Sequence, residues 1–155
     1  MSKIASRIKE LGIELSNAAS PAANYVPFVL SGNQVVISGQ IPFLNGELVG
    51  LGKLGSDLTV KEGAKIARIC GLNLLAQLQV ASGGDLDRVS RVVKLGGFVN
   101  CINTFTDQPE VINGASDLMV EVFGDIGRHA RFAVGVASLP RGVAVEVDGV
   151  FELHN

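Results

Sequence analysis

The helical pattern between Thr59 and Gly84 constrains the fold more than any other stretch of the sequence. Thr59 and Glu62 match a capping box, in which each side chain accepts a hydrogen bond from a free backbone amide at the helix start. The pattern ends at Ser82-Gly83-Gly84, a typical helix stop. Apolar residues cover a broad surface between these ends: Ala64, Ala67, Ile69, Cys70, Leu72, Leu74, Leu75 and Leu78. Such a surface is typical of a helix that lies on a sheet.

Strands are predicted on both sides of this helix. Residues 26–40 predict a β-hairpin, and residues 89–100 predict a strand because they are rich in β-branched side chains. Near the C-terminus, residues 131–138 and 143–153 have strong strand patterns and are separated by the turn-like sequence Leu139-Pro140-Arg141-Gly142. We therefore expect these two C-terminal strands to pair as an antiparallel hairpin.

Two further helices complete the predicted order of elements. Residues 2–11 form a short amphipathic pattern, with Ser2 as a possible N-cap and Gly12 as a stop. Residues 110–124 form the second long helix, preceded by Pro109. The sequence therefore predicts one α+β domain spanning residues 1–155, with a mixed sheet and two long helices packed on one face.

The expected C-terminal hairpin places charged side chains on one sheet face. In the last strand, Glu146 and Asp148 lie on the face opposite to that of Val143, Val145 and Val147. A symmetric turn would put Arg131 on the same face as Glu146, roughly 13 Å away along the strands, a spacing that could flank a small anionic ligand. A solvated charged face is the alternative interpretation of these residues.

Composition limits the classes of function. Hydrophobic residues make up 47% of the chain and charged residues 18%, against about 25% on average, and we interpret the apolar surplus as subunit interface. The net charge of −2 and the absence of a basic block disfavour nucleic-acid binding. No apolar run reaches the ~20 residues needed to span a membrane, and no secretory signal or disulfide framework is visible, so a cytoplasmic location is expected. With only His129 and His154 available, no metal site is predicted.

Three segments resemble the Rid (reactive intermediate deaminase) family, also called the YjgF-like or L-PSP endoribonuclease family. They are SPAANYVPFVLSGNQVVISGQIP, GDLDRVSRVVKLGGFVN and ARFAVGVASLPRGVAVEVDGVFEL, and the most specific piece is the pattern VGVAxLPxxxxVEV. The similarity runs from about residue 18 to residue 153, so residues 1–17 look like the N-terminal helical extension of a longer subgroup. The resemblance implies a chorismate-mutase-like fold, a homotrimer with inward-facing sheets, and clefts between the subunits.

The same resemblance implies roles for particular residues. It makes Arg131 the carboxylate-binding arginine and Glu146 the residue that positions water. Substrate-binding positions of the family fall on Tyr25, Gly39 and Asn113. One departure is Ala133, where family members often carry Cys or Ser, so that only its backbone amide could help hold a ligand.

The leading hypothesis from the sequence is hydrolysis of reactive enamine or imine intermediates, such as 2-aminoacrylate-like 2-imino acids, to 2-keto acids and ammonia. No cofactor is expected, because the imine carbon is already electrophilic. One alternative is a non-catalytic protein that binds a small carboxylate metabolite in the same cleft. A second alternative, an endoribonuclease or translation inhibitor, is disfavoured by the acidic pI of about 5.6.

Overall fold

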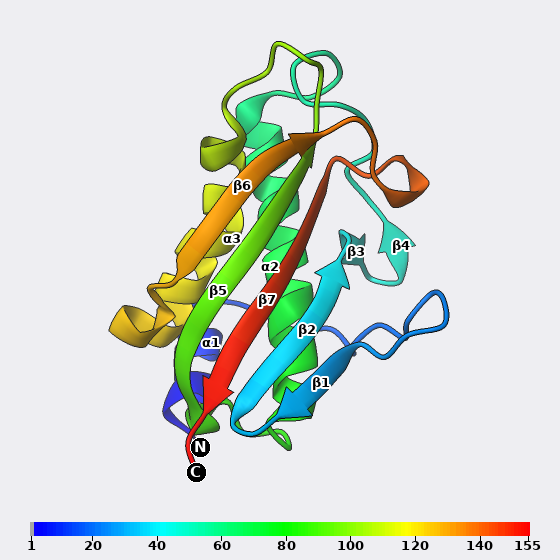
Figure 1. Cartoon of the computed structure of the whole chain (residues 1–155). Coiled ribbons are helices and arrows are strands. Elements are labelled where there is room, and N and C mark those ends of the chain that lie inside the picture. Colours follow the sequence, from blue (N-terminus) through cyan, green and yellow to red (C-terminus); the bar gives the residue numbers. More distant parts are fainter. Residues whose placement is uncertain (1) are drawn as a thin grey trace.

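Two long helices cover one face of a five-stranded sheet in the computed structural model, which describes residues 2–155 (Figure 1). The helices are α1 (Lys3–Glu10), α2 (Val60–Ala81) and α3 (Gln108–Phe123). The strands are β1 (Phe28–Ser31), β2 (Gln34–Gln40), β3 (Phe43–Leu44), β4 (Glu47–Leu48), β5 (Val89–Asn100), β6 (Ala130–Val136) and β7 (Val145–Leu153). The predicted α+β layer, with a mixed sheet and two long helices on one face, is confirmed. None of the described helices is long and apolar enough to cross a membrane.

Helix α2 begins where the sequence predicts. The Thr59 backbone amide donates to Glu62 Oε2 at 2.7 Å, and the Glu62 amide donates to Thr59 Oγ1 at 3.2 Å, so both halves of the capping box are formed. The predicted N-terminal helix is also confirmed, with the Ser2 hydroxyl accepting from the Ala5 amide. The carboxylate of Asp87 accepts hydrogen bonds from two other free amides in the first turn of α1, those of Lys3 and Ile4.

The strand order in the main sheet is β1-β2-β7-β5-β6. Strands β1 and β2 form the predicted hairpin, and β2 and β5 both pair with β7 in antiparallel orientation. Strands β5 and β6 are parallel, because the chain crosses through α3 between them.

The predicted C-terminal hairpin is wrong, because β5 lies between β6 and β7. The connection from β6 to β7 covers residues 137–144, which is long enough to pass over the end of β5. The turn at Pro140–Gly142 forms as a single 3₁₀ turn, with Arg141 and Gly142 at positive φ. After it, the Ala144 carbonyl accepts from Asn100 at the end of β5, so the returning chain pairs with β5 rather than β6.

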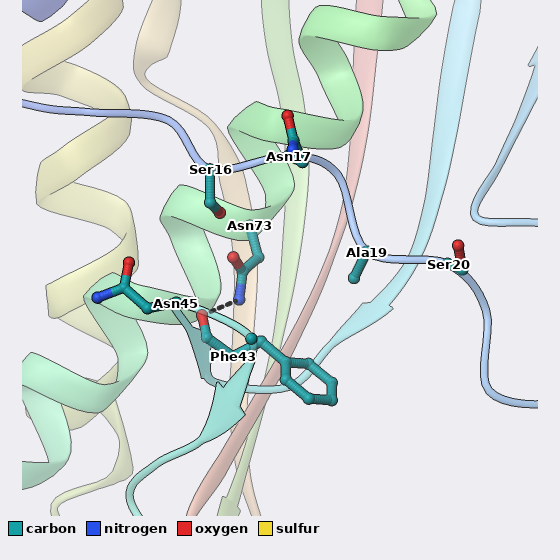
Figure 2. A pocket seen from close by; sticks show the side chains of 8 residues that line it. Ser16, Asn17, Ala19, Ser20, Phe43, Asn45 and Asn73 are labelled. Carbon is teal, nitrogen blue, oxygen red and sulfur yellow. Dashed lines mark hydrogen bonds between the residues drawn. The ribbon is translucent and has the colours of Figure 1, made fainter.

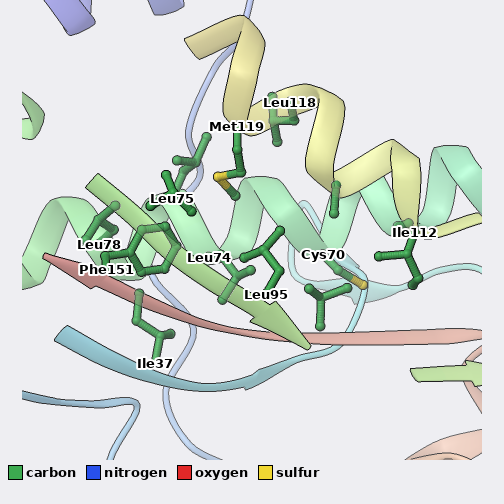
Figure 3. Packing of buried hydrophobic residues seen from close by; sticks show 14 of the residues in the cluster. Ile37, Cys70, Leu74, Leu75, Leu78, Leu95, Ile112, Leu118, Met119 and Phe151 are labelled. Atoms are coloured by element: carbon green, nitrogen blue, oxygen red, sulfur yellow. The ribbon is translucent and has the colours of Figure 1, made fainter. Parts of the chain in front are cut away.

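The core fills the space between the sheet and the two long helices (Figure 3). Strand β7 alternates strictly between buried and half-buried residues, as its sequence pattern predicts. Val145, Val147 and Phe151 are fully buried on the helix side. The opposite side of the sheet, here called the open face, carries Glu146 and Asp148.

A second, small hairpin follows β2. Strands β3 and β4 pair around Asn45 and Gly46, which both have positive φ. Asn73 of α2 holds the chain that enters this hairpin, because its Nδ2 donates to the carbonyls of Ile41 and Phe43 at 3.0 Å each.

Candidate functional site

Arg131 lies on the edge strand β6, and its side chain is turned toward α3. Its guanidinium donates from Nη1 to Asn113 Oδ1 at 2.8 Å and to Ser116 Oγ at 3.2 Å, and from Nη2 to the Pro109 carbonyl at 3.3 Å. Among residues 2–155 it forms no ion pair. A guanidinium has five N–H groups, so the Nε–H and one Nη2–H remain for a ligand. Arg131 is therefore fixed in position and has donors left for a carboxylate.

His129 and Ser116 extend this arrangement, and the sequence analysis missed them. His129 Nδ1 lies 2.6 Å from the Gly127 carbonyl, which can only accept, so Nδ1 carries the proton. Nε2 then accepts from the Ser116 hydroxyl at 2.9 Å, while Ser116 Oγ accepts from Arg131. Burial lowers the pKa of His129, and the charge of Arg131 lowers it further. A neutral His129 thus orients Ser116 without repelling the guanidinium.

Ala133 lies on the same side of β6 as Arg131 and packs against the core. It is half-buried and offers a ligand no side-chain donor. We call Arg131, Asn113, Ser116, His129 and Ala133 the arginine cluster.

Glu146 lies on the open face, where its carboxylate approaches Gly39. A Cβ added at Gly39 would collide with Glu146 Oε1, so only glycine allows this approach. The pairing of β2 with β7 is irregular between Ile37 and Gln40, at the same place. Burial raises the pKa of Glu146, and the negative charge of Asp148 raises it further. No ion pair within the described chain neutralises this carboxylate.

Tyr25 precedes β1 and lies near Gly39. The two residues line the same small hollow, together with Gln40. The segment is held to β2 by Ser38, whose hydroxyl donates to the Val26 carbonyl at 2.8 Å and whose amide donates to the Pro27 carbonyl. Tyr25 itself is 47% exposed. We call Glu146, Gly39, Tyr25 and Asp148 the glutamate cluster.

The expected placement of Arg131 and Glu146 on one sheet face is wrong. Arg131 pairs with Leu95, which is buried beneath the helices, whereas Glu146 pairs with Phe98 of the open face. The two strands that carry them are separated by β5. Within one chain the arginine and glutamate clusters therefore lie on opposite sides of the sheet.

Metal chemistry finds no support in these clusters. Within residues 2–155, no three His, Cys, Asp or Glu side chains are grouped so that they could hold a metal ion.

Comparison with known proteins identifies the family. Residues 5–148 match the family described as "YjgF/chorismate_mutase-like, putative endoribonuclease". The chain belongs to the YjgF/chorismate-mutase-like family. The resemblance inferred from the three sequence segments is thereby confirmed.

Several known proteins are similar to nearly the whole chain. Protein TCP17 of Trypanosoma cruzi is 54% identical over 154 residues, which are 99% of this chain and 96% of that protein. A solved structure of a protein of unknown function from Agrobacterium tumefaciens is 46% identical, with a TM-score of 0.91 over 97% of this chain and 92% of the other. A structure named as a putative endoribonuclease from Shewanella oneidensis is 37% identical, with a TM-score of 0.94 over 98% of this chain and all of the other.

Proposed function

We propose that this protein hydrolyses 2-imino acids to 2-keto acids and ammonia at a site formed between two copies of the chain. The observation that carries the proposal is the separation of the two clusters. A carboxylate-binding arginine faces one side of the sheet, and a carboxylate with a raised pKa faces the other. In the closed ring that we propose, every copy contacts the next copy in the same way, and the arginine cluster of one copy lies against the glutamate cluster of the next.

The open face supports assembly into such a ring, for which we propose a homotrimer. Val29, Val36 and Val134 are between 43% and 51% exposed on this face, and the register of the strands places them on the same side as Glu146. An apolar sheet face of this kind favours burial against another copy. Light scattering should give a mass near three times 16.2 kDa, and a monomer at micromolar concentration would contradict an intersubunit site.

In the proposed reaction, the substrate carboxylate binds the free Nε–H and Nη2–H of Arg131. Glu146 of the neighbouring copy takes a proton from water as the water oxygen bonds to the imine carbon. Glu146 returns that proton to the former imine nitrogen, which leaves a tetrahedral carbon with one hydroxyl and one amino group. The hydroxyl proton then passes through Glu146 to the amino nitrogen, the carbon–nitrogen bond breaks, and ammonia leaves as the carbon–oxygen double bond forms. Water supplies the oxygen of the 2-keto acid, so the balance needs no cofactor or oxidant.

The test of this function is a coupled assay in which a dehydratase generates 2-aminoacrylate and its disappearance is followed with and without the protein. Faster loss of 2-aminoacrylate, with matching formation of pyruvate and ammonia, supports the proposal. A rate equal to spontaneous hydrolysis contradicts it. Tight binding of a 2-keto acid without turnover would favour the alternative function, a carboxylate-binding protein. The observation that supports this alternative is Ala133, whose side chain carries no functional group.

Gly39→Ala should reduce imine hydrolysis by about 10²-fold, because a displacement of about 1 Å in a reacting group has this effect. The added methyl group would push the Glu146 carboxylate aside. Steady-state kinetics of the variant measure the loss. The control is the double variant Gly39→Ala/Glu146→Gln, which should be no slower than Glu146→Gln alone. Independent, multiplying losses would show that Gly39 acts by another route.

Asp148→Asn should move the acidic limb of the pH profile to lower pH. Glu146 acts as a base only when ionised, so kcat/KM falls as the pH drops through its raised pKa. Removing the charge of Asp148 removes one of the two causes of that increase and leaves burial, the larger cause. The profile of kcat/KM against pH for both proteins measures the shift. An unchanged limb, or one moved to higher pH, would exclude Glu146 as the titrating base.

A further inference from the structure

A second cavity lies beside the small hollow of Tyr25 and Gly39, under the segment that links α1 to β1. It has a volume of about 480 Å³ and lies between residues 16–20, the β3–β4 turn and the side of α2 (Figure 2). Its eight lining residues include no charged side chain, and five of them carry an amide or hydroxyl group: Ser16, Asn17, Ser20, Asn45 and Asn73. We call it the amide cavity. Its volume falls within the range of small-molecule sites.

Asn73 shows what this cavity is suited to bind. The side chain is only 8% exposed, and both hydrogens of Nδ2 are donated to the Ile41 and Phe43 carbonyls. These two bonds fix the amide, so that Oδ1 points away from Phe43 toward Ser16 (Figure 2). Oδ1 accepts no hydrogen bond from the described residues. Among these residues, every fully buried side-chain oxygen has a hydrogen-bond partner, so Asn73 Oδ1 is not fully buried and is open to the cavity. A mostly buried acceptor in this position requires a donor.

The lining residues also decide the charge of the ligand. A cation would find no carboxylate among them and an anion no basic side chain, so a charged group would lose hydration without a partner. The serine hydroxyls and the amides of Asn17 and Asn45 can both donate and accept. This combination matches a neutral molecule with several hydroxyl groups.

We propose that the amide cavity binds a neutral polyol of monosaccharide size, with one of its hydroxyls donating to Asn73 Oδ1. The site does not depend on the imine chemistry proposed above. It does share a wall with the hollow beneath Tyr25, because Ala19, Ser20 and Phe43 line both. Gln77 of α2 ties this wall down by donating to the Ala19 carbonyl at 2.8 Å. Occupation of the cavity therefore alters the surroundings of Tyr25.

Ligand-observed NMR with three related sugars tests the proposal on the full-length protein. D-glucose should show saturable binding, whereas protonated D-glucosamine and anionic D-glucuronate should bind about tenfold more weakly or not at all. Ser16→Leu, whose side chain would fill the cavity and leave both Asn73 bonds intact, should abolish glucose binding. Ser56→Leu, an exposed position in another loop, is the matched control and should bind glucose as the parent does.

Each contrary result is decisive. No saturable binding of glucose, equal binding of the three sugars, or undiminished binding by Ser16→Leu would overturn the site. Tyrosine emission reports on the shared wall, because Tyr25 is the only tyrosine and the chain has no tryptophan. Glucose should change this emission with the same midpoint as binding, and binding without such a change would refute the link to Tyr25.

Discussion

Glu146→Gln should lower the rate of imine hydrolysis by about 10²- to 10⁴-fold, the usual contribution of a positioned general base. The amide keeps the shape of the side chain but cannot take a proton from water. A glutamine side chain fits beside Gly39 as the glutamate does, so the affinity for a 2-keto acid should change little. Rates from the coupled assay and affinities from calorimetric titration separate these two effects.

The matched control for this variant is Glu152→Gln. Glu152 lies on the same strand and the same face as Glu146, but pairs with Gln34 at the opposite end of β7 from Glu146. This control should retain the parental rate. If the parent hydrolyses imines and Glu146→Gln matches its rate, Glu146 is not the base, and Asp148, two residues along the same face, would be the next residue to replace.

Arg131→Ala should weaken binding of 2-keto acids by between about 10-fold and 150-fold. Loss of a charge-assisted contact of this kind costs about 1.5–3 kcal/mol. The fold should survive, because Arg131 lies on an edge strand and its bonds to α3 are exposed or only part-buried. Calorimetric titration with a 2-keto acid measures the loss, and thermal unfolding monitors the fold.

Arg128→Ala provides the control for charge alone. Arg128 is three residues away, highly exposed and paired only with Asp125 at 3.6 Å, so its removal lowers the net charge equally without touching the arginine cluster. Equal affinity for the 2-keto acid in the parent and in Arg131→Ala would place Arg131 among the solvated surface charges.

Local sequence signals predicted the three helices and the five strands of the main sheet, because each depends on a few neighbouring residues. The Thr59–Glu62 capping box fixes the start of α2, and the alternation of β7 follows from the two-residue period of a strand. These patterns placed Glu146 and Asp148 together on one face of the last strand, and in the structure this face is the one away from the helices.

Strand order was not predictable in the same way, because it depends on contacts between distant residues. A turn-like Leu139–Gly142 between two strands favoured a hairpin, but β5 takes the place beside β7. The strand at residues 89–100 is longer than either C-terminal strand, and it pairs with both of them. The register between β5 and β6 places Arg131 on the helix side of the sheet, whereas the register between β5 and β7 places Glu146 on the open face.

The supporting residues of Arg131 had a weak signal in the sequence. Asn113 and Ser116 are three positions apart in α3, a spacing that puts both on one side of a helix. His129 is two residues before Arg131, but nothing local shows that its ring reaches Ser116. Only the packing of β6 against α3 brings the three side chains to the guanidinium.

Complementation between two variants that each lose most of their activity at low substrate concentration tests the intersubunit site most directly. Arg131→Ala and Glu146→Gln chains are unfolded together, refolded as a mixture, and assayed for imine hydrolysis after light scattering has confirmed the oligomer. If each site takes Arg131 from one copy and Glu146 from the next, random mixing restores about a quarter of the sites, and about a quarter of the parental activity should return. A mixture as inactive as the two separate variants would show that both residues act within one chain, or not at all, and would contradict the account.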